Sequence, residues 1–274
     1  MNYLLLLPLL SVVALSTAGA AEETNGHGCT DATLPRLDVP HCSSGTSGVA
    51  TINRRLVTLK DDFPESTVEL CYTDISLELK FQAQDEISFL VNETYVNNDS
   101  IWMWTVMEAF IATGDHDPTE YLEFEVAPNN VIYTARIHNP NKDFTKHSAA
   151  FIDDWDSYPI TSETTRDVEA QTWTSAVSLP LSMFNVAAPE GTHWRMNFFR
   201  TFYASSTDST AEQEYGAWNP NKLVSFHQSP CFGKVRLDGD DKAASEKCDE
   251  PSLSGGKSSK SKSGKTKLVK RTRV

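Results

Sequence analysis

Alternating apolar and polar positions along the chain predict short β-strands separated by turns. Residues 194–200 show this most clearly: Trp194, Met196 and Phe198 share one apolar face, and the other face mixes polar side chains with an aromatic ring. We expect further strands at 67–72, 75–81, 106–112, 121–127, 131–138, 173–179 and 232–237, and one helical turn at 181–184. Many short strands without a long amphipathic helix predict an all-β fold, an antiparallel β-sandwich.

The two ends of the chain differ from this body. Residues 1–21 form an apolar run closed by small residues, which predicts a secretory signal peptide. The run is too short to span a bilayer and no second one follows, so we expect a secreted, extracellular protein without a membrane span. Residues 22–48 form a Cys-containing N-terminal segment, 49–238 the sandwich, and 239–274 a Ser/Lys-rich tail expected to be disordered.

Charge is distributed unevenly between body and tail. Residues 251–274 carry eight of the 24 basic residues and no acidic one, which leaves the rest of the chain with a net charge of −21. Such an acidic body repels phosphates, so nucleic acid is not an expected partner. The basic tail suits an anionic surface, although a solubilising or processed tail is the simpler interpretation.

The five cysteines are Cys29, Cys42, Cys71, Cys231 and Cys248. No pair shows Cys-x-x-Cys spacing, and in a secreted protein this favours disulfide bonds over metal ligation. Cys29 and Cys42 flank a Pro-containing loop that a bond between them would close, and Cys71 lies on a predicted strand. The odd number leaves one thiol free or paired between chains, and the connectivity stays open.

Short motifs indicate two further surface features. N-glycosylation sequons begin at Asn92 and Asn98 and predict an exposed edge. Asp153, Asp154 and Asp156 are candidates for a structural calcium site, although solvated acidic loops are more common. No cofactor is required by anything in the sequence.

Six segments in order, together covering roughly residues 65–237, resemble the carbohydrate-binding module family 9-like domains. These domains belong to a broader group of jelly-roll sandwiches that includes the DOMON domains. Each segment alone is a weak motif, whereas six in order are specific. The segments are Trp102 with residues 107–111, then 121–130, Trp173 with 179–181, 194–200, 217–220 and 226–233.

The resemblance implies a jelly-roll sandwich in which two tryptophans enclose a terminal sugar ring. Matched by position, these are Trp102 and Trp218, and Glu108 accepts hydrogen bonds from sugar hydroxyls. Flat apolar walls with a few fixed polar groups suit a pyranose ring, which presents C–H groups on its faces and hydroxyls around its rim. Further polar candidates are Asn129, Arg195 and Asn197.

Several of these residues have a structural alternative. Trp104 shares the strand parity of Trp102 and is an alternative stacking residue. Glu108, on an apolar strand, is either a ligand group or half of an ion pair with Arg195 or Arg200. We expect Trp173 and Trp194 in the core.

The leading hypothesis is a secreted, non-catalytic protein that binds the end or a short stretch of a plant or microbial cell-wall glycan. A second hypothesis is a hydrolase acting on O-glycosyl bonds in polysaccharide breakdown. Such an enzyme needs two carboxylates about 5–9 Å apart across a cleft. Glu108 with Glu123 or Glu125 is the only pair that the sequence suggests.

A third hypothesis is a haem-binding redox domain, because related DOMON sandwiches bind haem. Axial ligation would then come from a methionine and a histidine. The sequence offers Met103 or Met107 with His227 for this role.

Overall fold

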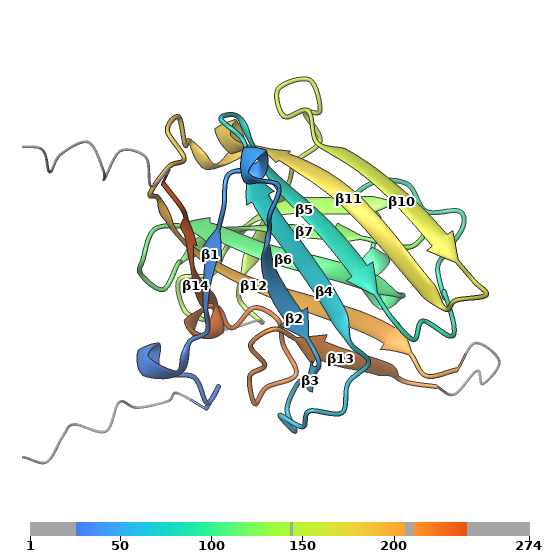
Figure 1. Cartoon of the computed structure of the whole chain (residues 1–274). Coiled ribbons are helices and arrows are strands. Elements are labelled where there is room, and N and C mark those ends of the chain that lie inside the picture. The colour runs from blue at the N-terminus through green and yellow to red at the C-terminus, as the bar shows by residue number, and fades with distance from the viewer. Residues whose placement is uncertain (1–25, 143–144, 206–210, 240–274) are drawn as a thin grey trace, which may run out of the picture. The chain divides into compact units, whose positions relative to one another are not determined.

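The computed structural model describes residues 26–142, 145–205 and 211–239. Two sheets, of nine and five strands, pack against each other as a sandwich (Figure 1). The predicted all-β class is therefore confirmed. The expected signal peptide at residues 1–21, nearly all of the tail at 239–274, and Cys248 lie outside the described residues.

The larger sheet has the strand order β1-β14-β12-β6-β7-β8-β9, and β13 pairs with both β12 and β3. Among its described strands only β1 and β14 run parallel. Its strands are β1 Arg36–Val39, β3 Arg54–Arg55, β6 Val106–Thr113, β7 Glu120–Val126, β8 Ile132–His138, β9 Ser148–Phe151, β12 His193–Tyr203, β13 Gln213–Ala217 and β14 Gly233–Leu237.

The smaller sheet has the order β10-β11-β5-β4-β2. Its strands are β2 Gly48–Ile52, β4 Ser66–Tyr72, β5 Ser76–Ala83, β10 Thr161–Asp167 and β11 Thr172–Pro180. The short 3₁₀ helices are η1 Asp31–Thr33, η2 Cys42–Ser44, η3 Ile101–Met103, η4 Leu181–Phe184 and η5 Ser229–Cys231.

All eight strands expected from alternation are present, and η4 is the predicted helical turn. Six further strands, β1, β2, β3, β9, β10 and β13, carry too little apolar alternation to be recognised. β10 is an edge strand whose seven residues are all polar, so no hydrophobic pattern marks it. Because β1 pairs with β14, the sandwich begins before residue 49, where the sequence placed its boundary.

β12 is an interior strand of the larger sheet, with β6 on one side and β14 and β13 on the other. Its residues Trp194, Met196 and Phe198 are almost completely buried in the core between the sheets. Trp173 of β11 is buried in the same core. The assignment of both tryptophans to the core is confirmed.

Arg200 also lies on the inner face of β12 and is fully buried. Its Nη1 donates to Ser66 Oγ at 2.9 Å and to the Gln84 carbonyl at 2.7 Å, and its Nη2 pairs with Glu86 at 3.1 Å. Arg200 is therefore part of a structural ion pair, but its partner is Glu86 and not Glu108.

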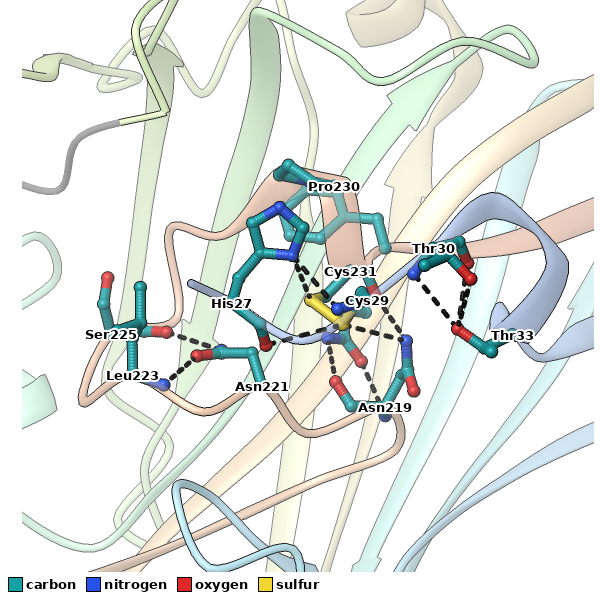
Figure 2. The surroundings of a disulfide bond; sticks show 12 residues. His27, Cys29, Thr30, Thr33, Asn219, Asn221, Leu223, Ser225, Pro230 and Cys231 are labelled. Carbon is teal, nitrogen blue, oxygen red and sulfur yellow. Dashed lines mark hydrogen bonds between the residues drawn. A yellow bond between two sulfur atoms is a disulfide. The ribbon is translucent and has the colours of Figure 1, made fainter. Parts of the chain in front are cut away.

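Two disulfide bonds join Cys29 to Cys231 and Cys42 to Cys71. Of the pairings that the sequence left open, a bond between Cys29 and Cys42 does not form, because both cysteines pair with later parts of the chain. Figure 2 shows the first bond, where Asn219 Nδ2 donates to the Cys231 carbonyl at 2.8 Å. This bond ties the N-terminal segment to η5, directly after the loop at residues 226–228.

Within the three described ranges, no helix has the length and apolar character needed to cross a membrane.

Candidate functional site

A cavity of about 550 Å³, called the pocket below, lies on the outer face of the larger sheet. Strand alternation decides which side chains reach it. Met107 and Phe124 point into the core, so their neighbours Glu108 and Glu123 point the opposite way. The central strands β6, β7, β8 and β12 contribute Glu108, Glu123, Tyr133 and Thr201 to its lining.

Aromatic side chains form the walls of the pocket. Trp102, from η3, packs edge-on against Tyr133 with 5.2 Å between ring centroids, and Tyr133 packs edge-on against Phe151 at 5.6 Å. Tyr215 and Phe226 form a second edge-on pair at 5.7 Å. Trp102 is 42% exposed and Phe151 57% exposed, so a ligand can reach both rings.

Glu108 and Glu123 line the pocket, and with the neighbouring Glu125 they form an acidic cluster. Glu108 lies directly opposite Glu125 in the β6–β7 ladder, and Glu123 precedes Glu125 by two residues on the same face. One oxygen from each carboxyl lies within 4.8 Å of the others. All three side chains are buried, and Glu108 Oε1 and Glu125 Oε2 have no hydrogen-bond partner among the described residues.

This arrangement is costly for the fold. Like charges directly opposite each other destabilise a sheet, and a buried polar atom without a partner costs about 1–3 kcal/mol. Burial raises the pKa of Glu123 to about 8. Burial and the nearby acidic groups raise the pKa values of Glu108 and Glu125 well above their ordinary value. Carboxyls with raised pKa values in a cavity are typical of functional sites.

His227 lies at the edge of the acidic cluster. Its Nδ1 is 2.9 Å from the Tyr121 hydroxyl, and its ring stacks on His147 at 4.1 Å. Burial, with a smaller effect of His147, lowers the pKa of His227 to about 3. Its Nε2 is 3.7 Å from Glu123 Oε1. Burial disfavours the charged form of both groups, so a neutral contact is favoured over a salt bridge.

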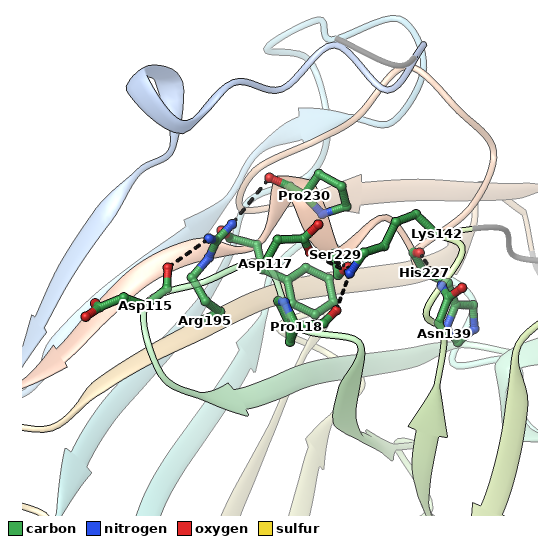
Figure 3. A network of polar contacts seen from close by, with 10 residues as sticks. Asp115, Asp117, Pro118, Asn139, Lys142, Arg195, His227, Ser229 and Pro230 are labelled. Atoms are coloured by element: carbon green, nitrogen blue, oxygen red, sulfur yellow. Dashed lines mark hydrogen bonds and ion pairs between the residues drawn. The ribbon is translucent and has the colours of Figure 1, made fainter. Parts of the chain in front are cut away.

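A polar network holds the loops around the pocket, and it uses Arg195 (Figure 3). Arg195 donates from Nε to the Phe232 carbonyl at 2.9 Å, and its Nη1 donates to the Asp115 carbonyl at 3.2 Å. Asn139 Nδ2 donates to the His227 carbonyl at 3.0 Å and fixes the loop that carries this histidine. Arg195 is therefore bonded to backbone carbonyls and does not line the pocket.

Asn197 and Trp218 are likewise structural in this arrangement. Asn197 Oδ1 accepts from the backbone of Phe198 and Asn219, and its Nδ2 donates to the Asn219 carbonyl at 3.0 Å. Trp218 packs against core residue Phe198 at 5.7 Å, and a side chain on Gly233 would come within 2.3 Å of the Trp218 ring. The structure thus places Trp218 on the core side of the sheet and Trp102 in the pocket, so they do not form a two-tryptophan clamp.

The remaining candidates lie outside the pocket. Asn129 is in the turn after β7, where its Nδ2 reaches the Asn92 carbonyl at 3.5 Å and its Oδ1 is buried without a partner among the described residues. The ring of Trp104 packs against Tyr95 and does not line the pocket. Of the two tryptophans weighed for stacking, the structure brings Trp102 to the pocket.

The structure also shows the surroundings of the expected calcium ligands and of the two sequon asparagines. Asp153, Asp154 and Asp156 are exposed and do not converge on a common point in the described structure, and Asp154 caps a turn by accepting from the Ser157 backbone. Asn98 bonds through its side chain to the backbone of β8 and to Ile152. Glycosylation remains a prediction, and Asn92 is the better placed of the two.

The methionines expected for haem ligation do not approach His227. Met107 is buried in the core on the inner face of the sheet, whereas His227 lines the pocket on the outer face. Met103 is 55% exposed and does not line the pocket. The pairing of Met107 with His227 as axial ligands is therefore wrong.

Sequence reasoning missed much of the pocket wall. Tyr133, Phe151, Tyr215 and Phe226 come from four separate elements, and two of those, β9 and β13, were not recognised as strands. A signal did exist for the acidic cluster, because Glu123 and Glu125 alternate with apolar residues on β7. Their convergence with Glu108 depends on strand pairing, which alternation does not specify.

Comparison with known proteins supports the fold and the family. No family model matches the chain. A protein of Bacteroides uniformis ATCC 8492, provisionally described as carbohydrate-binding, shares the fold with a TM-score of 0.58 and 16% identity, over 75% of this chain and all of that one. The fold implied by the sequence resemblance is thereby confirmed, and the grouping with DOMON domains stays a prediction.

Two structures of a carbohydrate-binding module family 9 protein from Caldicellulosiruptor kristjanssonii, with cellotriose and with glucose, give TM-scores of 0.48 and 0.47 at 11% and 13% identity. These matches cover 81% and 75% of this chain, and 100% and 97% of the modules. A protein of Arthroderma benhamiae (strain ATCC MYA-4681 / CBS 112371), named an extracellular protein, is 42% identical over 231 residues. The alignment covers 83% of this chain and 98% of that protein, and the chain therefore belongs to the same family as this extracellular protein.

Proposed function

We propose that this protein is secreted and binds carbohydrate, without cleaving it, in the pocket on the outer face of the larger sheet. The observation that carries the proposal is the pocket itself, which is lined both by the accessible rings of Trp102 and Phe151 and by the buried carboxyls of Glu108 and Glu123. Flat aromatic walls receive the C–H faces of a sugar ring, and Glu108 and Glu123 receive its hydroxyls.

Two comparisons support this proposal. The Bacteroides uniformis protein that shares the fold is provisionally described as carbohydrate-binding. The Arthroderma benhamiae relative is named an extracellular protein, which supports secretion. A glycan of a plant or microbial cell wall is the ligand class that a secreted binding protein of this kind meets.

Hydrolysis of glycosidic bonds is a second candidate function, favoured by the proximity of Glu108 and Glu123 in the pocket. A retaining glycosidase uses two carboxyls about 5–5.5 Å apart, one as a protonated acid and one as an ionised nucleophile. Glu123, with a pKa of about 8, fits the acid. Glu108 fits the nucleophile less well, because burial and the nearby Glu123 raise its pKa and so favour its protonated form. Binding is therefore the better supported function.

The test is titration calorimetry with gluco-, xylo- and chito-oligosaccharides, each also in its borohydride-reduced form. We expect at least one series to bind, and Trp102→Ala to weaken that binding roughly tenfold because a stacking surface is removed. Loss of binding on reduction would indicate recognition of a sugar end. Release of reducing sugar during the titration would instead favour the hydrolase.

A matched control is Trp218→Phe, which changes a tryptophan on the core side of the same sheet. We expect it to bind like the parent protein. If Trp218→Phe lost binding while Trp102→Ala kept it, the ligand site would lie elsewhere and the pocket would have no role.

A further inference from the structure

The ionisable side chains that line the pocket are acidic, apart from two histidines. Glu108 and Glu123 line it and Glu125 lies beside them, whereas no Lys or Arg is present among the described residues of the lining. The basic residues of the lining are His147 and His227, and burial holds the pKa of His227 far below neutrality. A neutral sugar needs only a few acceptors, so three buried carboxyls exceed what hydroxyl recognition requires.

The acidic cluster is compact enough for its oxygens to accept all three hydrogen bonds of one primary ammonium group. An ammonium carries three N–H donors, and charge-assisted bonds of about 2.8 Å place three acceptors roughly 4.6 Å apart. Oxygens of Glu108, Glu123 and Glu125 lie within 4.8 Å of one another. Glu108 Oε1 and Glu125 Oε2, both buried, have no partner among the described residues.

The walls of the pocket also suit a cation. Trp and Tyr rings attract a positive charge held near their faces, and the attraction is larger where water is excluded. Trp102, Tyr133 and Tyr215 line the same pocket as Glu108 and Glu123 of the acidic cluster. The same rings receive the C–H groups of a sugar, so one pocket satisfies both parts of a ligand that is a sugar and a cation.

We infer that the pocket selects an amino sugar with a free, protonated amine, as found in deacetylated cationic glycans, and that the amine sits on Glu108 and Glu123. This inference rests on the proposed carbohydrate-binding function and names the class of sugar. The neutral form of the cluster then serves as the resting state. On binding, the ammonium keeps its three protons, and one carboxyl of the cluster releases its proton to the buffer and becomes the counter-ion.

The experiment is calorimetry of the purified full-length protein at pH 6 with three trimers: glucosamine, N-acetylglucosamine and cellotriose. A charge-assisted bond is stronger than a neutral one, so we expect the glucosamine trimer to bind at least tenfold more tightly than cellotriose. We expect the heat of binding of the glucosamine trimer to differ between two buffers of different ionisation enthalpy, because the released proton is taken up by the buffer. Cellotriose should show no such difference.

Two variants test whether the acidic cluster causes the preference for the amino sugar over the neutral sugar. Glu108→Gln and Glu123→Gln keep the shape of the side chain and each remove one carboxyl that holds the amine, so the ratio of glucosamine to cellotriose affinity should fall toward one. Glu163→Gln, on the exposed edge strand β10, is the matched control and should keep the parent ratio. An unchanged ratio in both cluster variants would overturn the inference.

The outcomes separate the inference from the proposed function. Equal or tighter binding of cellotriose would overturn the amine preference and leave carbohydrate binding standing. No binding of any trimer would contradict both. A linear diamine that binds as tightly as the glucosamine trimer would show that the sugar ring is not recognised. Calcium that binds alone and blocks the trimer would make the cluster a metal site and overturn the inference.

Discussion

Two groups of buried ionisable side chains lie on opposite faces of one strand pair. In the β6–β12 ladder Arg200 is opposite Met107, and the next position pairs Phe199 with Glu108. Arg200 therefore enters the core and meets Glu86, whereas Glu108 faces the pocket and meets two further glutamates. One residue along a strand separates a balanced ion pair from a cluster of three carboxyls.

The two groups also differ in their hydrogen bonds. Glu86 accepts from Arg200, from the Ser88 hydroxyl, from the Phe89 backbone and from Trp173 Nε1. Arg200 has partners for both terminal nitrogens, and its Nε alone lacks one in the described structure. The acidic cluster instead leaves oxygens of two glutamates unpaired. A satisfied buried charge specifies a structure, whereas an unsatisfied one is a cost that a ligand can offset.

The largest effect should come from breaking the balanced pair. Arg200→Met leaves Glu86 buried without its counter-charge, and removal of one partner of a buried pair costs about 3–5 kcal/mol. Urea denaturation should show this loss in the free energy of unfolding. The double variant Arg200→Met/Glu86→Gln should recover a large part, because no charge is then left unpaired. A loss below about 1 kcal/mol in the single variant would show that the pair has no structural role.

A second test uses pH. The pKa of Glu123 is about 8 in the folded protein, above the ordinary 4.5 expected when unfolded, so unfolding releases its proton between these values. Stability should therefore fall as pH rises, by about 1.4 kcal/mol per pH unit for each such carboxyl. His227, lowered to about 3 from 6.5, acts in the opposite direction, but only below about pH 6.5. The clearest window is pH 6.5 to 8.

Between pH 6.5 and 8, the free energy of unfolding of Glu123→Gln should fall less steeply with pH than that of the parent, by roughly 1.4 kcal/mol per pH unit. Urea denaturation at several pH values measures this slope. Glu108 and Glu125, whose pKa values are raised well above ordinary, account for further decline and should remain in this variant. Glu163→Gln is the exposed control and should keep the parent slope. Equal slopes for Glu123→Gln and the parent would mean that Glu123 is ionised in the folded protein.

The difference between the two groups also shows which features of the structure can be predicted from the sequence. Alternation correctly predicted which face of β12 enters the core, because period-2 patterning is local. It did not predict that Glu125 lies opposite Glu108, because register is set by pairing between strands. Trp218 was misplaced for a related reason. It follows the last residue of β13, where alternation no longer indicates the direction of a side chain.

The smallest effect should come from the acidic cluster at low pH. At pH 5 the raised pKa of Glu125 keeps its carboxyl neutral, so Glu125→Gln replaces one uncharged polar group with another of similar shape. Its Oε2 has no hydrogen bond to lose among the described residues, so the change in the free energy of unfolding should stay within about 1 kcal/mol. At pH 8 the same variant should become more stable than the parent, since an amide does not titrate. A loss comparable to that of Arg200→Met at pH 5 would mean that Glu125 is a charged structural partner, and the contrast between the two faces of the sheet would disappear.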